Sequence, residues 1–274
     1  MTTPELSGDA PPVDEGPSVW AQVGAGLLAG LRVAGNGMAA AYDAVDPDAR
    51  RDLARMPVLG ITSLGPRHTP PVAKGDDGHR PLILVHGLGG NRGNFRLMRG
   101  WLGLQGRRRS YAVGLPVDVP LADLGRHLAH YVDEVVAVNK LGNDAQVDIV
   151  AHSMGGLVAR LALLDVGTAQ RVHSLITLGT PHHGTQAARF TGHHRGRDLR
   201  PDSDVMQQLA GQVPWHGPVR LVCLWSHADP LMQPADTARV EGAENLELPQ
   251  MTHIQYLLDR RAWRAVREAL IDIG

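Results

Sequence analysis

The chain has 274 residues, and apolar side chains make up 43% of it, so it can bury a sizeable core in one large domain or two small ones. The formal net charge is −1 at pH 7, which does not favour binding to nucleic acid or to an anionic membrane surface. The single cysteine, Cys223, excludes an intramolecular disulfide, and the apolar residues around it predict a buried side chain.

The N-terminal 79 residues differ in composition from the rest of the chain. Residues 1–18 are rich in proline, glycine and acidic residues, which predicts a disordered tail. They contain no Lys or Arg, unlike the basic start of a signal peptide, so we expect a cytoplasmic protein without one. We expect residues 19–79 to form a helical arm and a linker, with a helix beginning at Pro47 and a short strand at Val58–Thr62.

The predicted arm carries an apolar face formed by Leu27, Leu28 and Leu31. Packing of this face on the rest of the domain is the commoner arrangement for such a segment. The alternative is that the arm lies on a membrane surface or on a partner, so that the protein is membrane-associated.

From residue 80 onward, short apolar runs alternate with amphipathic segments. The apolar runs predict strands at 82–85, 111–113, 147–150, 172–178, 219–225 and 246–248. Apolar residues spaced by three and four predict helices at 94–105, 121–138, 156–164, 202–209 and 256–273. This alternation is typical of an α/β fold with a mostly parallel central sheet flanked by helices, here in one domain over residues 80–274.

The stretch around Ser153 has the features of a nucleophile elbow. An apolar strand, 147–150, leads into Ala151-His152-Ser153-Met154-Gly155, and a helical pattern follows directly. A strand, a sharp turn that carries serine and then a helix are the context this motif requires. Ala151 replaces the usual glycine but is still small. A five-residue pattern can also arise by chance as a plain turn, and the flanking elements favour the elbow.

A serine nucleophile needs a base, and the base needs an acid that orients it. In α/β hydrolases these partners follow the serine in the order acid, then histidine. Asp229 directly follows a predicted strand, whereas its rivals Asp236 and Glu244 lie farther from the strand end. His253 is the only histidine after Asp229 and follows the last predicted strand. We therefore predict a triad of Ser153, Asp229 and His253.

Two backbone N–H groups are candidates to stabilise the oxyanion of the tetrahedral intermediate. One belongs to Met154, the residue after the nucleophile. The other belongs to Leu88, in a glycine-rich loop that follows the strand at 82–85. A plain glycine turn is the alternative interpretation of that loop, but its position after a buried strand favours the oxyanion hole.

Three segments together resemble those of α/β-hydrolase lipases and esterases. They read HGLGG at 86–90, AHSMGG at 151–156 and LGTPHHG at 178–184. The sequence is most similar to bacterial triacylglycerol lipases with the AHSMG elbow, and it also resembles lipase-like domains related to GPI inositol deacylases. The resemblance covers about residues 80–273 and implies the same oxyanion hole and triad as above. The substrate-contacting positions that it implies are Gly87, His152 and Pro181.

Residues 185–216 correspond to the region where lipases often carry a lid. The segment is rich in arginine and histidine, which argues against a lid that depends strictly on a lipid interface. The histidines at 182, 183, 193 and 194 could suggest a metal site, but paired histidines near arginines are more often a solvated loop. We therefore expect no metal and no cofactor.

These features predict a serine carboxylic ester hydrolase, a lipase or esterase, that acts on an acyl ester or lipid through an acyl-enzyme. The same triad would serve an acyltransferase, which passes the acyl group to an alcohol instead of water. Amide hydrolysis uses the same machinery. A non-catalytic binding protein with this fold is less favoured, because such proteins usually lose a triad residue. We expect no nucleic-acid partner, and membrane contact would involve the N-terminal arm or the lid-like segment.

Overall fold

A computed structural model describes residues 47–62, 69–142, 144–190 and 194–271. The predictions for residues 1–46, including the disordered tail and the apolar leucine face, lie outside these ranges. The centre of the structure is a six-stranded sheet of order β2-β1-β3-β4-β5-β6, in which every neighbouring pair is parallel. The strands are β1 (Leu82–Val85), β2 (Ser110–Ala112), β3 (Val147–His152), β4 (Val172–Leu178), β5 (Arg220–Trp225) and β6 (Glu244–Glu247).

The strand order reverses between β1 and β3. The chain runs outward from β1 to β2 at one edge, then returns past β1 and continues through β3 to β6 at the other edge. The chain therefore leaves β1 and β3 in opposite directions, and the loops after these two strands separate. Open parallel sheets commonly bind ligands in the crevice between two such loops. These two loops carry the predicted oxyanion residue Leu88 and the predicted nucleophile Ser153.

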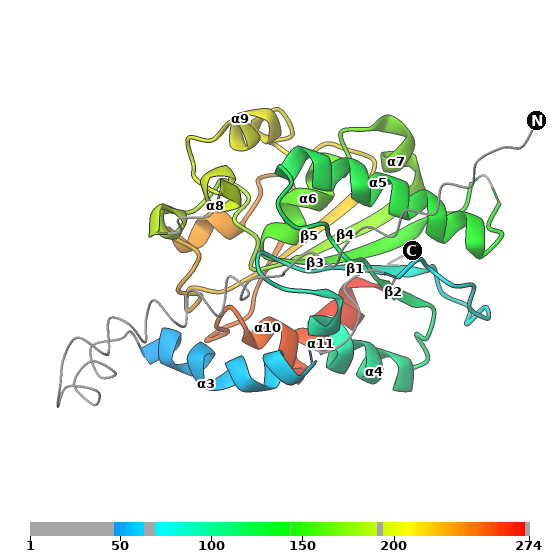
Figure 1. Ribbon diagram of the computed structural model, residues 1–274, viewed down its shortest axis with the longest axis horizontal. Helices are drawn as coiled ribbons and strands as arrows, with labels where there is room; N and C mark the ends of the chain where they lie inside the picture. Colours follow the sequence, from blue (N-terminus) through cyan, green and yellow to red (C-terminus); the bar gives the residue numbers. More distant parts are fainter. Residues whose placement is uncertain (1–46, 63–68, 143, 191–193, 272–274) are drawn as a thin grey trace, which may run out of the picture.

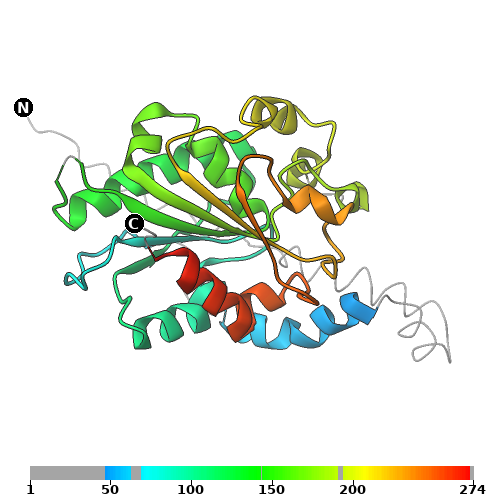
Figure 2. The same ribbon diagram turned by 180° about the vertical axis from the view of Figure 1, so that it is seen from behind.

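Helices cover both faces of the sheet. One face carries α5 (Leu121–Val138), α6 (Met154–Ala162) and α7 (Val166–Arg171), and the other carries α4 (Arg96–Leu104), α10 (Gln255–Leu258) and α11 (Arg260–Ala269) (Figures 1 and 2). Helix α3 (Pro47–Thr62) lies on the second face, beside α10. The predicted α/β class with a mostly parallel, helix-flanked sheet is confirmed.

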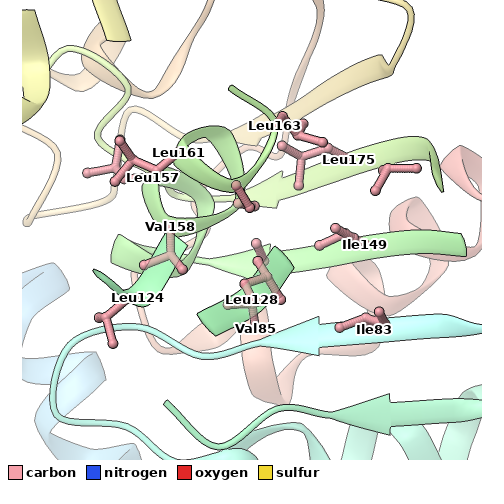
Figure 3. Packing of buried hydrophobic residues seen from close by; sticks show 14 of the residues in the cluster. Ile83, Val85, Leu124, Leu128, Ile149, Leu157, Val158, Leu161, Leu163 and Leu175 are labelled. Atoms are coloured by element: carbon pink, nitrogen blue, oxygen red, sulfur yellow. The ribbon is translucent and has the colours of Figure 1, made fainter. Parts of the chain in front are cut away.

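The apolar side chains of the central strands are divided between two apolar clusters on opposite faces of the sheet. Ile83 and Val85 point toward α5 and α6, where they lie in one cluster with Leu128 and Val158 (Figure 3). Leu82 and Leu84 belong to the second cluster, on the side of α4 and α11. Since both faces are covered, all four residues of β1 are fully buried, as expected from its continuous apolar sequence.

The strand predicted at Val58–Thr62 is wrong, because these residues form the last turns of helix α3. The buried positions of that helix explain the outcome. Asp52, Met56 and Leu59 are spaced by four and three residues, which places them on one helix face toward the domain. The helix begins at Pro47 as predicted.

The single closing helix predicted at 256–273 is also wrong, because α10 and α11 are separated at Asp259. This residue has extended backbone, and its carboxylate accepts a hydrogen bond of 2.8 Å from the N–H of Arg261. Asp259 thus caps the start of a new helix, which is a common role of aspartate. The sequence pattern also missed α7, and the structure begins α4 with a 3₁₀ turn, η1 (Arg92–Phe95).

In its described residues, the lid-like segment contains three short helices: η2 (Gln186–Phe190), α8 (His194–Asp198) and α9 (Asp204–Ala210). Helices α8 and α9 lie on the α6 side of the sheet (Figure 1). Val205, Met206 and Leu209 of α9 are buried in the first apolar cluster. A further 3₁₀ turn, η3 (Ala235–Ala238), precedes β6. Within the described ranges, we find no helix with the length and apolar character needed to cross a bilayer.

Candidate active site

Ser153 lies at a sharp turn between β3 and α6. Its backbone angles are φ 56° and ψ −130°, a region that is strained for any residue other than glycine. The surrounding backbone holds this conformation: the Ser153 N–H donates to the Leu178 carbonyl at 2.9 Å, and its carbonyl accepts from the Gly156 N–H at 3.0 Å. The Thr180 hydroxyl donates to the same carbonyl at 2.9 Å. The side chain is half-buried, as the elbow motif requires.

The close packing of the turn explains which positions must be glycine. A β-carbon on Gly155 would lie 2.5 Å from the Val85 carbonyl oxygen, and one on Gly156 would lie 2.2 Å from Thr180 Oγ1. Ala151, by contrast, is accommodated as a fully buried residue in β3. The departure from the usual motif at Ala151 therefore leaves the elbow intact.

Asp229 and His253 form a buried pair. His253 Nδ1 lies 2.8 Å from Asp229 Oδ2, and neither side chain is exposed to solvent. The other carboxylate oxygen of Asp229 accepts from the Leu231 N–H at 3.0 Å. A carboxylate at Nδ1 keeps the proton on that nitrogen and leaves Nε2 as the basic atom when the ring is neutral. Asp236 is exposed and Glu244 binds Arg220 at 2.6 Å, so neither rival lies at this position.

The surroundings of His253 favour its protonated form. Burial by itself lowers the pKa of His253, but the charge of Asp229, its hydrogen bond and the nearby charge of Asp52 together raise that pKa above the usual histidine value. An imidazolium at this position is therefore stabilised, which is what a base that receives a proton during a reaction needs.

His152 connects the elbow to the base. Its Nε2 donates to the His253 carbonyl at 3.0 Å, and the two rings pack with centroids 4.6 Å apart. Burial, and next the charge of His253, lower the pKa of His152 well below its ordinary value, so this ring is neutral. Nε2 of His253 is buried and has no hydrogen-bond partner among the described residues, Ser153 included. Catalytic hydrogen bonds are often long in the absence of substrate.

The loop after β1 approaches the serine closely. A β-carbon on Gly87 would be 2.8 Å from Ser153 Cβ. The Gly87 carbonyl accepts from the Gly90 N–H at 3.1 Å and lies 3.0 Å from His86 Nδ1, so it points into its own loop. In a trans peptide the next N–H, that of Leu88, points the opposite way. That N–H and the first N–H of α6, at Met154, are the two candidate oxyanion donors.

Ser153 opens into a narrow cleft. Its empty space is about 290 Å³, and part of this volume is open to solvent. Its lining residues are Leu59, Gly87, Leu88, Gly90, Asn94, His152, Ser153, Ile254 and Leu257. A larger open depression, with about 1040 Å³ of empty space, is lined by His183, Asp236 and Arg239 but by none of the triad candidates, so we place the reacting group in the smaller cleft.

The remaining predicted positions lie as follows. Gly87 and His152 line the cleft, whereas Pro181 is buried in the loop after β4 and is not among the lining residues. Its contact with substrate stays a prediction. Cys223 is buried as expected, and burial raises the pKa of its thiol to about 12.

His182 and His183 have different partners. His182 Nε2 lies 3.0 Å from Thr177 Oγ1, and His183 Nε2 lies 3.1 Å from the Arg239 carbonyl. In the part of the chain that the structure describes, no cluster of three His, Cys, Asp or Glu residues is arranged to hold a metal ion.

The sequence motifs missed four residues around the site. Leu59, Asn94, Ile254 and Leu257 line the cleft but belong to no motif. A fifth, Asp52 of α3, accepts hydrogen bonds from residues on both sides of His253. Only its helical spacing with Leu59 indicated that it faces the domain.

Comparison with known proteins supports the resemblance noted in the sequence. Residues 122–194 match the family model of the PGAP1-like alpha/beta domain. A triacylglycerol lipase of Burkholderia plantarii is 31% identical over 149 residues, which are 50% of this chain and 40% of that protein. A triacylglycerol lipase of Pseudarthrobacter phenanthrenivorans is 32% identical over 118 residues, 40% of this chain and 35% of that protein. The matched part of the chain thus spans less than half the length of these curated relatives.

Solved structures show the same fold. Aspergillus fumigatus lipase B has a TM-score of 0.62 at 18% identity, covering 74% of this chain and 55% of the lipase. The mature lipase BlEst2 of Bacillus licheniformis also has a TM-score of 0.62, at 20% identity, covering 74% of this chain and 96% of the lipase. The chain therefore has the α/β-hydrolase fold, and its sequence similarity to lipases, predicted from three motifs, is confirmed.

Proposed function

We propose that this protein is a serine carboxylic ester hydrolase of the lipase or esterase type. The observation that carries the proposal is the buried pair of Asp229 and His253, with a 2.8 Å hydrogen bond, together with Ser153 on a strained elbow whose preceding residue, His152, packs against the His253 ring. The similarity to triacylglycerol lipases supports the same chemistry. An acyl ester or a lipid is the proposed substrate.

In the acylation step, Nε2 of His253 removes the proton from Ser153 as its Oγ attacks the ester carbonyl carbon. The carbonyl oxygen becomes an oxyanion, which accepts hydrogen bonds from the N–H groups of Leu88 and Met154. When the intermediate collapses, the C–O bond to the alcohol breaks and His253 gives its proton to the leaving oxygen. Asp229 keeps the ring oriented and stabilises the imidazolium.

In the deacylation step, a water molecule takes the place of the alcohol. His253 removes one of its protons, and the resulting tetrahedral intermediate again places its oxyanion at Leu88 and Met154. Collapse breaks the bond to Ser153 Oγ, releases the carboxylic acid and restores the serine hydroxyl. Nε2 of His253 and the N–H groups of Leu88 and Met154 are used in the same way in both steps.

The cleft suits an acyl chain better than a polar group. Four of its lining residues, Leu59, Leu88, Ile254 and Leu257, have aliphatic side chains. Because the cleft is small, we infer that a wall moves to admit a long acyl chain, as in other hydrolases with mobile covers.

The same narrow, largely apolar cleft also favours a second candidate, an acyltransferase. An acyl-enzyme that is shielded from water lives long enough to react with another alcohol. Product analysis with a competing alcohol distinguishes the two: free acid identifies a hydrolase, and a new ester identifies a transferase.

The direct test is hydrolysis of p-nitrophenyl esters of increasing acyl length by the wild type and Ser153→Ala. A fluorophosphonate probe reports on Ser153 independently of the acyl group. We expect ester turnover and labelling in the wild type and neither in the variant. A folded wild type with no turnover and no labelling would refute the serine mechanism, and labelling without turnover would indicate another acceptor or substrate.

A further inference from the structure

Helix α3 places a buried carboxylate behind the candidate base. Asp52 is only 8% exposed although it lies 200 residues before Thr252 in the chain. Its Oδ1 accepts a hydrogen bond of 2.5 Å from the Thr252 hydroxyl and one of 3.0 Å from the Ile254 N–H. These donors are the neighbours of His253 on either side, so one oxygen atom holds both ends of the short segment that carries the base.

The position is an unusual place for a carboxylate. Both donors are neutral groups, and an amide oxygen would accept from them equally well. Burial raises the pKa of Asp52, which shows that the environment penalises its charge. The same charge lies close enough to raise the pKa of His253. The two hydrogen bonds explain why residue 52 has an acceptor oxygen. The electrostatic effect on the pKa of His253 explains why this acceptor is a carboxylate rather than an amide.

We propose that Asp52 is a positioning residue for His253: its two hydrogen bonds fix the backbone on both sides of the base and hold Nε2 toward Ser153. This inference rests on the proposed function of His253 as the general base. It assigns to helix α3, which lies outside the segment that resembles lipases, a direct part in building the active site.

The remainder of α3 fits this role. Leu59 lies seven residues, about two turns, after Asp52 on the same helix face. It is buried and lines the cleft together with Ile254 and Leu257. One end of the buried face therefore holds the histidine segment, while the other end forms a wall next to Ser153. Movement of α3 would change both the position of the base and the width of the cleft.

The titratable groups near His253 come from four elements. Asp229 lies in the loop after β5, His152 lies at the end of β3 and Asp52 lies in α3, while Tyr256 of α10 packs against the His152 ring with centroids 6.4 Å apart. His152 is neutral because its pKa is lowered, and Tyr256 keeps its proton because burial raises its pKa well above the usual value. Asp229 and Asp52 are the two carboxylates among these four groups, and both raise the pKa of His253.

The test compares Asp52→Ala, which removes the acceptor, with Asp52→Asn, which keeps an acceptor oxygen but removes the charge. Asp133→Asn is the matched control, because Asp133 is an exposed carboxylate on α5 at the other face of the sheet. The readouts are kcat and KM on a p-nitrophenyl ester, the rate of fluorophosphonate labelling, the pH profile of kcat/KM and the melting temperature.

We expect Asp52→Ala to lower kcat and the labelling rate by roughly 10- to 100-fold, the range of a slightly misplaced catalytic group, with little change in KM. Asp52→Asn should recover most of this loss. It should also shift the acidic limb of kcat/KM to lower pH, because loss of a negative charge lowers the pKa of the base, and the base must be neutral to act. Asp133→Asn should change none of these quantities.

A merely structural role would give a different result: both Asp52 variants would melt at lower temperature, with kcat, labelling rate and pH profile of the folded fraction unchanged. That outcome would overturn the proposal. If Asp52→Ala does not fold, the pH profile of kcat/KM for Asp52→Asn still tests the proposal. The pKa of His253 measured by NMR in the wild type and Asp52→Asn tests the contact without turnover. An unchanged pKa would contradict the electrostatic contact between Asp52 and His253 even if the wild type hydrolysed no ester, which separates its failure from that of the proposed function.

Discussion

Gly87 and Ser153 are in direct contact: a β-carbon added to Gly87 would lie 2.8 Å from the β-carbon of the serine and 3.1 Å from the His152 carbonyl oxygen. Real β-carbons essentially never approach other atoms so closely, so the two backbones can be neighbours only because position 87 has no side chain. The loop that offers the Leu88 N–H is thereby held against the nucleophile, where an oxyanion donor must be.

Gly87→Ala should therefore displace this loop from the elbow. We expect kcat to fall by roughly 100-fold, the cost of moving a catalytic group by about 1 Å. Steady-state kinetics on a p-nitrophenyl ester measures the effect. Gly100→Ala is the control, because a β-carbon there meets nothing within 4 Å. Full activity of Gly87→Ala would show that the loop supplies no donor.

Asp229→Asn should disable the base while leaving the cleft unchanged. An amide at Nδ1 favours the wrong tautomer of His253, so we expect kcat to fall by roughly 10⁴-fold with KM nearly constant. The isosteric change should leave substrate binding intact. Asp236→Asn alters an exposed carboxylate in the same region and should retain wild-type kinetics. Equal losses in both variants would point to a general electrostatic effect.

The pH dependence of activity follows from the raised pKa of His253. The base must be neutral in the free enzyme, so kcat/KM should rise with pH through that pKa and reach its plateau above the usual histidine range, which is centred near about 6.5. The raised pKa also affects stability. Protonated His253 stabilises the folded protein fully at a pH below the pKa that this residue has in the unfolded chain. The contribution disappears as the pH rises through the pKa of His253 in the folded protein. If the acidic limb of kcat/KM had its midpoint well below the usual pKa range of histidine, the assignment of His253 as the base would be contradicted.

Leu59→Ala should widen the cleft at its α3 wall. Leu59 is 5% exposed, so removing its side chain should lower the free energy of unfolding by about 2–4 kcal/mol and should move the acyl-length optimum toward longer chains. Val58→Ala, on the same helix but 44% exposed, is the control and should leave the optimum unchanged. Kinetics over a series of acyl lengths and thermal denaturation measure the two effects. An unchanged optimum would mean that the acyl chain binds elsewhere.

Arg160→Met should loosen the lid-like segment. Arg160 is fully buried on α6 and donates to the Leu209 carbonyl at 2.8 Å, to the His182 carbonyl at 3.1 Å and to Gln212 Oε1 at 3.0 Å. Loss of these donors leaves buried acceptors unsatisfied, at a cost of about 1–3 kcal/mol for each.

We expect a lower melting temperature for Arg160→Met and faster amide hydrogen exchange in α9. Arg126→Met, on α5, removes an arginine side chain that is 76% exposed and should have little effect on either quantity. Unchanged exchange in α9 would show that apolar packing alone anchors the segment.

Local patterns predicted much of the fold. Strands β1 and β4 and helix α5 begin and end at the predicted residues, because continuous apolar runs and regular helical spacing are properties of neighbouring residues. The apolar spacing failed to predict a helix boundary where a side chain caps the backbone of a neighbouring residue. Asp259 ends one helix and caps the next, and the apolar spacing on either side of it gives no sign of the break.

The sequence by itself determined the candidate groups and their order along the chain: an elbow serine, an acid after β5 and one remaining histidine. These follow from local motifs and from the fixed order of strands in the fold. Only the tertiary structure decided that Asp229 rather than Asp236 contacts His253, that α3 forms part of the site and that Asp52 holds the histidine segment. Such contacts join residues up to 200 positions apart, and their partners are set by how helices pack on the sheet rather than by any nearby pattern.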